Sequence, residues 1–585
     1  MNTEINTGAN MPDEVNKLKE HSIAEFFKKN RQMLGLYGKL RSLTTIIHEY
    51  VANSIDACEE AGILPEIEVK IVKLGEEHFE VHVIDNGPGI DEKNLGKALG
   101  KLLAGTKFHR LIQMRGQQGI GASGCILFSQ MTCGKPTKVI SGNSGKPVYM
   151  EIGINVEKNE PIVTSKKYLD KEFKGLAISS EFKEIDYQDS SQNALEYLKR
   201  TAIANPHVTI KFLDPFDKLY VFERSINTIP PKPTEISMHI KCVDTDTLVN
   251  GAKNSDAKTV TGYLKENYDR VGDKFFDDLQ QSLGKDLNLK DMRKKDLDWS
   301  TAEKIIKAIQ KTKTIAPRTD ALIPISEESL TASIKNILKP ETLYTLTRKP
   351  TAYKGGYPFQ VEVAISYGGN SGRVLKDGSI KSEIMRFANR TPLLFDPGSC
   401  AITNAINSID WKRYHIKDFD NEPITVIVSL SSVHIPYTNA GKQAVAEENE
   451  IIDEIKLALM TAARAISNHI SRKMKHGMKL ERKKMFERYS YELAYALEIL
   501  TGEKAKDITP KLEEIILKRL ELEDEEEQEN TDYSKCSLED KKTKDELEED
   551  IIDNNDDNKT SQKGKIGKTK TLKEFMDDWN ATHTR

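Results

Sequence analysis

One stretch of the chain, HEYVANSIDACEEAG from His48 to Gly62, constrains its fold more than any other. Glu49, Asn53 and Asp56 are spaced at i, i+4 and i+7, which places their side chains on one face of a helix. Two carboxylates and an amide on one face can activate a water molecule and hold a hydrated Mg²⁺ through oxygen atoms. Taken alone, the stretch also fits an ordinary amphipathic helix with a solvated polar face.

A second feature follows this helix. Segments 66–74 and 79–86 alternate apolar and polar residues and predict a β-hairpin, whose second strand runs into the sequence DNGPG. Asp85, at the end of that strand, can accept a hydrogen bond from an exocyclic amine such as that of adenine. Gly87 and Gly89 allow the backbone to turn tightly and to approach a flat ligand. An ordinary turn is the alternative for these residues alone.

The third feature is a glycine-rich loop, RGQQGIGASG, that opens a helix and offers backbone N–H groups to phosphates. Its last six residues fit the dinucleotide pattern G-x-G-x-x-G. That pattern requires a strand directly before it, whereas the preceding residues are polar and basic. A Walker A sequence is absent from the chain. The candidate ligand-contacting residues here are Thr106, Lys107, Arg115, Gly116, Gln117, Gln118, Gly119, Ile120, Gly121 and Ala122.

In this order and at this spacing, the three features resemble the asparagine box and the two glycine boxes of the GHKL ATPase family. The resemblance implies the α/β sandwich (Bergerat fold) of that family, with ATP and Mg²⁺ as cofactors. It implies that Glu49 is the general base for the attacking water, that Asn53 ligates Mg²⁺ and that Asp85 binds adenine. A carboxylate at position 49 favours ATP hydrolysis over the phosphate transfer of histidine kinases.

Beyond the shared boxes, the sequence is similar to the B subunits of type IIB DNA topoisomerases (topoisomerase VI). The matching stretches are RGQQGIGASG with LFSQMTCGKP, and residues 197–212, 384–403 and 435–442. Leu176 departs from the pattern, because a threonine is expected there. By itself Lys442 reads as a surface lysine. The resemblance implies that it is the switch lysine of a transducer domain, which contacts the γ-phosphate and stabilises the transition state.

The same resemblance implies an α+β multidomain chain. Its expected parts are an N-terminal strap and GHKL ATPase domain (1–240), a helix–two-turn–helix domain (241–317), a ribosomal S5-like transducer domain (318–470) with a long C-terminal helix, a basic helical region in contact with an A subunit (471–520), and an acidic disordered tail (521–585). The basic clusters in the second and fourth parts fit either DNA contacts or solvated faces. Within the tail, residues 571–580 have helical apolar spacing.

Composition limits the class of protein. Hydrophobic residues make up 38% of the chain and charged residues 30%. No apolar run reaches the roughly 18 residues that a membrane helix needs. The six cysteines are scattered without CxxC pairs, which predicts neither a disulfide framework nor a zinc site. Residues 521–557 include 18 acidic and 4 basic residues, whereas the whole chain has a net charge of −4, so the remainder is basic. A basic body with an acidic tail favours contact with a polyanionic partner, and solubility alone is the alternative explanation for either part.

These observations predict the ATP-hydrolysing subunit of a type II topoisomerase, located in the cytoplasm or at the nucleoid. Two copies would dimerise when ATP binds and would capture double-stranded DNA. No cleaving tyrosine or Toprim signature is recognisable, so DNA cleavage would occur on another chain. The resemblance implies that the other chain is a topoisomerase VI A subunit, in an A2B2 heterotetramer. The alternatives are a GHKL clamp of the chaperone or mismatch-repair type without topoisomerase activity, and a DNA-binding scaffold with a degenerate ATP site.

Overall fold

The structure is a computed structural model that describes residues 22–104, 111–116, 119–143, 145–284, 287–439, 441–515 and 518. The predicted site residues Thr106, Lys107, Gln117 and Gln118 lie outside these ranges, as do the acidic tail and its 571–580 segment. The chain divides into two units, Met1–Met474 and Lys475–Arg585, which are described separately.

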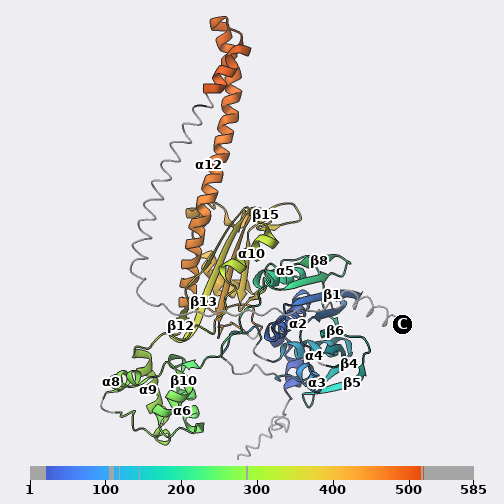
Figure 1. The fold of residues 1–585 in the computed structure, drawn as a ribbon, viewed down its shortest axis with the longest axis vertical. Coiled ribbons are helices and arrows are strands. Elements are labelled where there is room, and N and C mark those ends of the chain that lie inside the picture. The colour runs from blue at the N-terminus through green and yellow to red at the C-terminus, as the bar shows by residue number, and fades with distance from the viewer. Residues whose placement is uncertain are drawn as a thin grey trace, which may run out of the picture. The chain divides into compact units, whose positions relative to one another are not determined.

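The first unit begins with an eight-stranded sheet in the order β5-β4-β3-β6-β2-β1-β7-β8 (Figure 1). Its strands are β1 (Glu66–Gly75), β2 (His78–Asp85), β3 (Thr137–Gly142), β4 (Val148–Asn155), β5 (Glu160–Tyr168), β6 (Gly175–Lys183), β7 (Thr209–Leu213) and β8 (Leu219–Phe222). Strands β1 and β2 pair antiparallel, as the alternation of their residues predicts, and this pairing sets Ile67 opposite Asp85. Asp85 therefore ends a strand in the middle of the sheet.

Helices cover one face of this sheet, because each has an apolar stripe that matches the inward side chains of the strands. They are α1 (Ile23–Lys29), η1 (Arg31–Leu34), α2 (Lys39–Ala61), α3 (Glu92–Gly100), α4 (Gly121–Cys133) and α5 (Ala194–Ala204). Ile46, Val51 and Ile55 of α2 lie in one core with Val81 of β2 and Ile126 of α4. The predicted α/β sandwich is confirmed, and α2 is its central helix.

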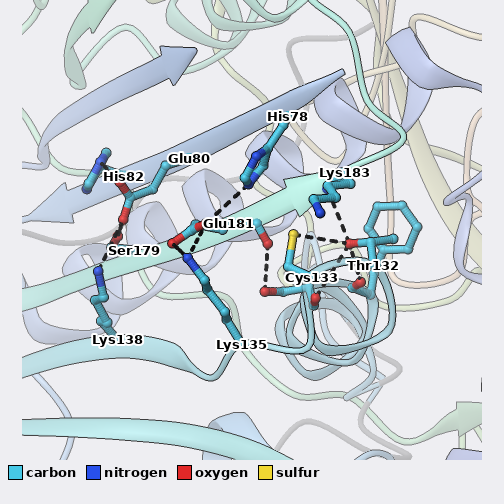
Figure 2. A network of polar contacts seen from close by, with 12 residues as sticks. His78, Glu80, His82, Thr132, Cys133, Lys135, Lys138, Ser179, Glu181 and Lys183 are labelled. Atoms are coloured by element: carbon cyan, nitrogen blue, oxygen red, sulfur yellow. Dashed lines mark hydrogen bonds and ion pairs between the residues drawn. The ribbon is translucent and has the colours of Figure 1, made fainter. Parts of the chain in front are cut away.

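The opposite face of the sheet is polar, because β2 alternates buried apolar residues with half-buried charged ones. Figure 2 shows the resulting network. The Glu181 carboxylate accepts hydrogen bonds from Lys135 Nζ (2.7 Å) and pairs with His78 Nε2 (3.1 Å). Ser179 donates to Glu80 at 2.7 Å. Cross-strand polar pairs of this kind fix the register of neighbouring strands without needing an apolar cover.

A helical segment follows, with its own apolar core around Leu248, Leu264, Leu279 and Ile305. Its elements are β9 (Met238–His239), η2 (Ile240–Cys242), α6 (Thr245–Asn254), α7 (Val260–Asn267), β10 (Tyr268–Asp269), α8 (Asp273–Leu283), η3 (Lys294–Asp296) and α9 (Trp299–Lys311). Strand β9, which precedes α6, pairs in parallel with β10, which follows α7. The chain that enters α6 therefore lies beside the chain that leaves α7. This region agrees with the helical character predicted for residues 241–317.

The third part of the first unit is a six-stranded sheet in the order β11-β13-β18-β16-β17, with β12 beside β13. Its elements are α10 (Glu327–Leu338), β11 (Thr342–Thr347), β12 (Thr351–Tyr353), β13 (Tyr357–Tyr367), β14 (Arg373–Val374), β15 (Ile380–Lys381), β16 (Glu383–Ala388), β17 (Thr391–Pro392), η4 (Pro397–Ser399), α11 (Ala401–Asn407), η5 (Trp411–Tyr414), η6 (Phe419–Asn421), β18 (Ile424–Ser432) and α12 (Asn449–Thr501). All nine residues of β18 are buried, since helices cover both faces of this central strand.

The two sheets of the first unit are joined by buried contacts. Ile203 of α5 packs in one apolar cluster with Ile334 of α10 and Ile427 of β18. Arg200 of α5 donates to Glu383 of β16 at 2.9 Å, and both side chains are almost fully buried. The position of the ATPase sheet relative to the second sheet is therefore fixed by packing and by a buried ion pair.

The second unit contains the part of α12 beyond residue 474 and a helical stretch over 505–515. Its exposed apolar side chains include Met478, Phe486, Tyr489 and Tyr495. The helix predicted for the basic region is present over the described residues. No helix among the residues that the structure places has both the length and the apolar character to cross a membrane.

Candidate nucleotide site

A cavity of about 350 Å³ lies where α2, the end of β2, the start of α4 and the loop after β18 meet. Cavities of this size accommodate small-molecule ligands. Ten predicted site residues line it: Glu49, Asn53, Asp85, Gly89, Gly116, Gly119, Ile120, Gly121, Ala122 and Lys442. Gly87 and Arg115 are not among the lining residues. The structure thus brings together, from four separate segments, most of the residues selected from the sequence.

On α2, the cavity receives the side chains of Glu49 and Asn53, one turn apart. Asn53 Nδ2 donates to the backbone carbonyl of Glu49 at 2.7 Å, which leaves the amide oxygen of Asn53 as the atom suited to a metal ion. Asp56, expected on the same face, lies about 10 Å farther along the helix from Glu49, given the rise of 1.5 Å per residue. Its carboxylate binds Arg115 rather than lining the cavity.

At the end of β2, Asp85 is 2% exposed and is held by three hydrogen bonds. Ser54 Oγ donates to Oδ2 at 2.7 Å, while the backbone N–H groups of Gly87 and Leu176 donate to Oδ1 at 2.9 and 3.1 Å. Burial raises the pKa of Asp85, although these three bonds act in the opposite direction. A carboxylate fixed in this way presents its remaining acceptor capacity in one direction, as recognition of an adenine amine requires.

The neighbouring backbone approaches Asp85 closely. Gly175 has φ +119°, and a Cβ on it would lie 1.9 Å from the backbone oxygen of Asp85. Gly89 has φ +67°, and a Cβ there would lie 2.5 Å from the carbonyl oxygen of Gly142. Only glycine fits either position. Leu176, which replaces an expected threonine, supplies its backbone N–H to Asp85, and that contact does not depend on a hydroxyl side chain.

The described part of the glycine loop ends at Gly121, the first residue of α4. Ile120 precedes the helix without a side-chain capping bond. A Cβ on Gly121 would lie 1.8 Å from Glu49 Oε2, so the absence of a side chain lets the Glu49 carboxylate lie against the start of α4. The N–H groups of a helix start favour anions. Glu49 therefore lies at the end of the cavity where phosphates would bind.

Arg115, predicted to contact the ligand, is engaged elsewhere. Its guanidinium donates to Asp56 (2.6 Å), to both oxygens of Glu59 (2.7 and 2.9 Å) and to Asn205 (2.5 Å), and its side chain is 7% exposed. Burial would lower the pKa of Arg115, but the charges of Glu59 and Asp56 outweigh burial and raise it. A role in contacting phosphate stays a prediction, whereas the ion pairs tie this residue to α2.

Lys442 reaches the cavity from the loop that follows β18. Its φ of +52° is unusual for a residue with a side chain, and such strain clusters at functional sites. Burial lowers the pKa of Lys442, while the nearby carboxylates of Glu49 and Asp56 act to raise it. An amine held near the cavity by these surroundings is suited to a phosphate with which it can form an ion pair.

The structure also places one residue in the site that the sequence interpretation missed. His48 lines the cavity beside Glu49. Its Nδ1 lies 3.0 Å from the hydroxyl of Tyr197, and its Nε2 lies 3.9 Å from Glu49 Oε1. Burial lowers the pKa of His48. The sequence could have indicated His48, because it directly precedes Glu49. Its hydrogen-bond partner Tyr197 could not be found in this way, because it is 149 residues away in the chain.

No cluster of three or more His, Cys, Asp or Glu side chains suited to a metal ion occurs among the described residues. The oxygen donors that line the cavity include those of Asn53 and Glu49, which lie one helical turn apart on α2. Mg²⁺ typically takes one or two protein ligands together with phosphate oxygens and water. The donor set therefore fits Mg²⁺ that arrives with a nucleotide.

The sheet order, the buried aspartate and the glycine loop at a helix start define a GHKL-type ATPase. A family model described as histidine kinase-, DNA gyrase B- and HSP90-like ATPase matches residues 41–190, and a model of the topoisomerase VI transducer, from the B chain of that enzyme, matches residues 317–483. The chain belongs to the family of type 2 DNA topoisomerase 6 B subunits, the ATP-hydrolysing subunits of type IIB DNA topoisomerases.

The relatives cover most of the chain. The B subunit of type 2 DNA topoisomerase 6 from Methanothermobacter thermautotrophicus is 47% identical over 470 residues, which are 80% of this chain and 89% of the relative. The protein of the same name from Pyrococcus abyssi is 43% identical over 556 residues, 88% of this chain and 97% of the relative. That of Pyrococcus horikoshii is 42% identical over 561 residues, with 88% and 98% covered. These matches favour a topoisomerase over a chaperone or mismatch-repair clamp.

Proposed function

We propose that the cavity binds ATP and that Glu49 is the general base that activates the attacking water. The proposal rests chiefly on the contact between the Glu49 carboxylate and the start of α4, where Gly121 leaves room for it. A base must lie within reach of the water that it deprotonates, and a helix start is where the phosphates would bind. Asp85 binds the adenine amine, and Lys442 contacts the γ-phosphate and stabilises the negative charge of the transition state.

We further propose that Mg²⁺ enters with ATP and is ligated by the amide oxygen of Asn53. When bound, the ion would supply positive charge that offsets the negative charge of the phosphates. The chain's own contribution is to orient the Asn53 amide through its bond to the Glu49 carbonyl, which also keeps base and metal ligand one helical turn apart. Gly87 and the 116–122 loop, together with Thr106, Lys107 and Arg115, remain proposed ligand contacts.

The proposed assembly contains two copies of this chain and two DNA-cleaving A subunits. ATP bound between the ATPase and transducer domains favours dimerisation of the N-terminal regions around a DNA duplex, and hydrolysis releases it. The exposed apolar residues of the second unit, within the proposed 471–520 region, are the proposed contact with the A subunit. The domain boundaries proposed from the sequence (1–240, 241–317, 318–470, 471–520 and 521–585) complete this arrangement in an intracellular, DNA-associated enzyme.

The test is relaxation of supercoiled DNA by the full chain, with and without an A subunit from a relative. We expect relaxation that needs ATP, Mg²⁺ and both subunits. The chain with Glu49→Ala should retain nucleotide binding and should support no relaxation. Relaxation by this chain alone, or relaxation without ATP, would contradict the two-subunit proposal. ATP hydrolysis without any relaxation in the presence of the A subunit would favour the clamp alternative.

A further inference from the structure

Residues 389–396, NRTPLLFD, include strand β17 of the second sheet and are connected to both ends of helix α2 by hydrogen bonds and ion pairs. We propose that this segment, here called the α2 clamp, positions α2 relative to Lys442 and so sets the rate of ATP hydrolysis. The proposal deepens the function proposed above and rests on the role of Lys442 given there. The clamp includes the turn between β16 and β17 and the chain that follows it.

At the C-terminal end of α2, Arg115 joins Asp56 and Glu59 to Asn205, and Asn205 in turn donates to the backbone carbonyl of Arg390 at 3.1 Å. Arg390 itself is 7% exposed and donates to the carbonyl of Pro324 at 2.8 Å. Burial lowers the pKa of Arg390 to about 10, although the charge of Glu59 acts to raise it. The end of α2 and the clamp therefore share one buried charge network.

The same turn also holds the chain that enters the glycine loop. Asn389 Nδ2 donates to the carbonyl of Met114 at 3.2 Å and to that of Ser432 at 2.9 Å. Gln113 exchanges two hydrogen bonds with the backbone of Ile323, at 2.6 and 2.9 Å. Residues 113–115 are thus fixed between α2 on one side and the second sheet on the other. Their position cannot change without breaking bonds to the clamp.

At the N-terminal end of α2, Arg41 forms a bidentate ion pair with Asp396, at 2.9 and 3.0 Å. The guanidinium also lies over the rings of Tyr37 and Phe395, 4.3 and 4.7 Å from their centroids. Leu394 and Phe395 pack in the core of the ATPase sheet. Bidentate pairs fix orientation as well as distance. The clamp is therefore connected to α2 on both sides of Glu49, directly through Asp396 and indirectly through Asn205 and Arg115.

The clamp is connected directly to the loop that carries Lys442. Arg386, three residues before Asn389 on β16, donates to the carbonyls of Phe395 (2.8 Å) and Gln443 (3.5 Å). The side chain of Gln443 accepts a hydrogen bond from the N–H of Phe395 at 3.3 Å. Gln443 follows Lys442 in the chain. The residue next to the lysine and the α2 clamp consequently share one buried set of hydrogen bonds, so a shift of the clamp is transmitted to the loop that carries Lys442.

The local chemistry of the turn indicates a role beyond stability. Asn389 and Arg390 have φ values of +48° and +62°, and Ala388 pairs with Thr391 across them. Two-residue turns with two positive φ values favour Asn-Gly, because glycine adopts them without strain. An arginine here is strained, and among the described side chains its Nε is one of the buried nitrogens without a hydrogen-bond partner. Strain of this kind persists where the surrounding contacts over-determine the conformation, and for a buried side chain it points to a functional constraint.

The experiment uses the full chain with Arg390→Gly, which creates the preferred Asn-Gly turn and removes the guanidinium. Because glycine relieves the backbone strain of the turn, we expect a melting temperature within about 3 °C of that of the unaltered chain. We expect kcat for ATP hydrolysis to fall about tenfold with KM within about twofold, since Lys442 is displaced from Glu49 while nucleotide still docks. Asp217→Gly is the matched control: it removes another positive-φ side chain, in the exposed β7–β8 turn, and should leave kcat unchanged.

A double-mutant cycle separates positioning from general damage. In a chain that already has Lys442→Ala, Arg390→Gly should change kcat by less than about twofold, because the lysine it positions is gone. The second variant is Arg390→Lys, which keeps the positive charge. Its kcat should fall by less than about threefold. Equal kcat for Arg390→Gly and the unaltered chain, or fully additive losses in the double variant, would overturn the clamp and leave Lys442 in its proposed role. If Lys442→Ala alone changes nothing, the proposed function fails and the clamp's role with it.

Discussion

The polar and charged groups in the two halves of α2 differ in whether other protein groups bind them. Around Glu49 and Asn53, the helix borders a cavity, and these polar groups keep bonding capacity for a ligand. Two turns later, Asp56 and Glu59 are bonded to a buried arginine and, through Glu59, to His207 at 2.9 Å. The same residue types thus border a cavity at one end of the helix and form buried ion pairs at the other. What distinguishes them is whether protein partners satisfy them.

The comparison is tested most strongly by Glu49→Ala. We expect kcat to fall by about 10² to 10⁴-fold, the usual contribution of a general base, while ATP binding and dimerisation persist. Steady-state hydrolysis, nucleotide titration and light scattering with a non-hydrolysable analogue measure the three properties. Glu92→Ala, which removes a partly buried carboxylate that pairs with Lys166 at the start of α3 and does not line the cavity, is the control and should keep full activity. Turnover close to that of the unaltered chain would remove Glu49 from the mechanism.

Glu59 lies ten residues further along the same helix, and there we expect a substitution to lower the stability of the fold. The charge of Arg115 and the bond to His207 hold the pKa of Glu59 well below its usual range, although burial alone would raise it. Glu59→Gln leaves Arg115 with Asp56 as its remaining carboxylate. We expect the free energy of unfolding to fall by about 2–3 kcal/mol, because a partly uncompensated charge stays buried. Urea unfolding at pH 7 measures this value, and an unchanged midpoint would show that the two halves of α2 do not differ.

Lys442→Ala tests the cavity from the side of the second sheet. Removing one charge that stabilises the transition state is expected to lower kcat by about 10²-fold, while nucleotide still docks on the ATPase sheet. ATP-dependent dimerisation should weaken as well, since the lysine joins the two domains through the ligand. Hydrolysis assays and light scattering provide the measurements. Normal hydrolysis together with normal dimerisation would count against the proposed role of this residue.

His48→Phe tests the cavity half of α2 further, and we expect it to lower kcat less than Glu49→Ala or Lys442→Ala does. The histidine, bonded to Tyr197, is in place to orient the Glu49 carboxylate once the 3.9 Å separation closes around a substrate. Loss of one such bond is expected to lower kcat by about threefold to tenfold at unchanged KM. Tyr197→Phe should give a loss in the same direction but smaller. A change confined to KM would assign His48 to ligand binding instead.

The sequence predicted which residues of α2 lie together at the cavity, because the signals for that half of the helix are local. Helical spacing places Glu49 beside Asn53, and a strand end followed by glycines places Asp85 in the wall of the same cavity. The other half of α2 depends on partners that are distant in the chain. Arg115 pairs with Asp56, at a sequence separation of 59 residues, and with Glu59, at a separation of 56 residues. Spacing along a chain identifies a face of a helix, but it does not identify what packs there. The contact predicted for Arg115 followed from charge alone and did not account for those partners.

The fold shows the same limit. Alternation predicted the β1–β2 hairpin, and the helical character of residues 241–317 was predicted from composition and spacing. The α2 clamp was not predicted, although residues 384–403 were recognised as matching a family pattern. Its turn has Asn389 and Arg390 at positions where a sequence interpretation expects Asn-Gly. Only the structure shows that Arg390 is buried beside Glu59, because burial of a charged residue follows from tertiary packing.

The smallest expected effect concerns the outer face of the ATPase sheet, where carboxylates are only half-buried. Burial would raise the pKa of Glu80, but His82, Ser179 and Lys138 together lower it to about 2, from an ordinary value of 4.5. A lowered pKa stabilises the folded state above pH 4.5, and this contribution disappears as pH falls through about 2. With allowance for solvent screening it is on the order of 1 kcal/mol. Glu80→Gln should therefore be less stable than the unaltered chain at pH 7, and the difference should narrow from pH 4.5 downward. Urea unfolding at pH 7, 4.5 and 3.5 measures it, and a difference that stays constant over this range would mean that Glu80 acts through packing rather than through its charge.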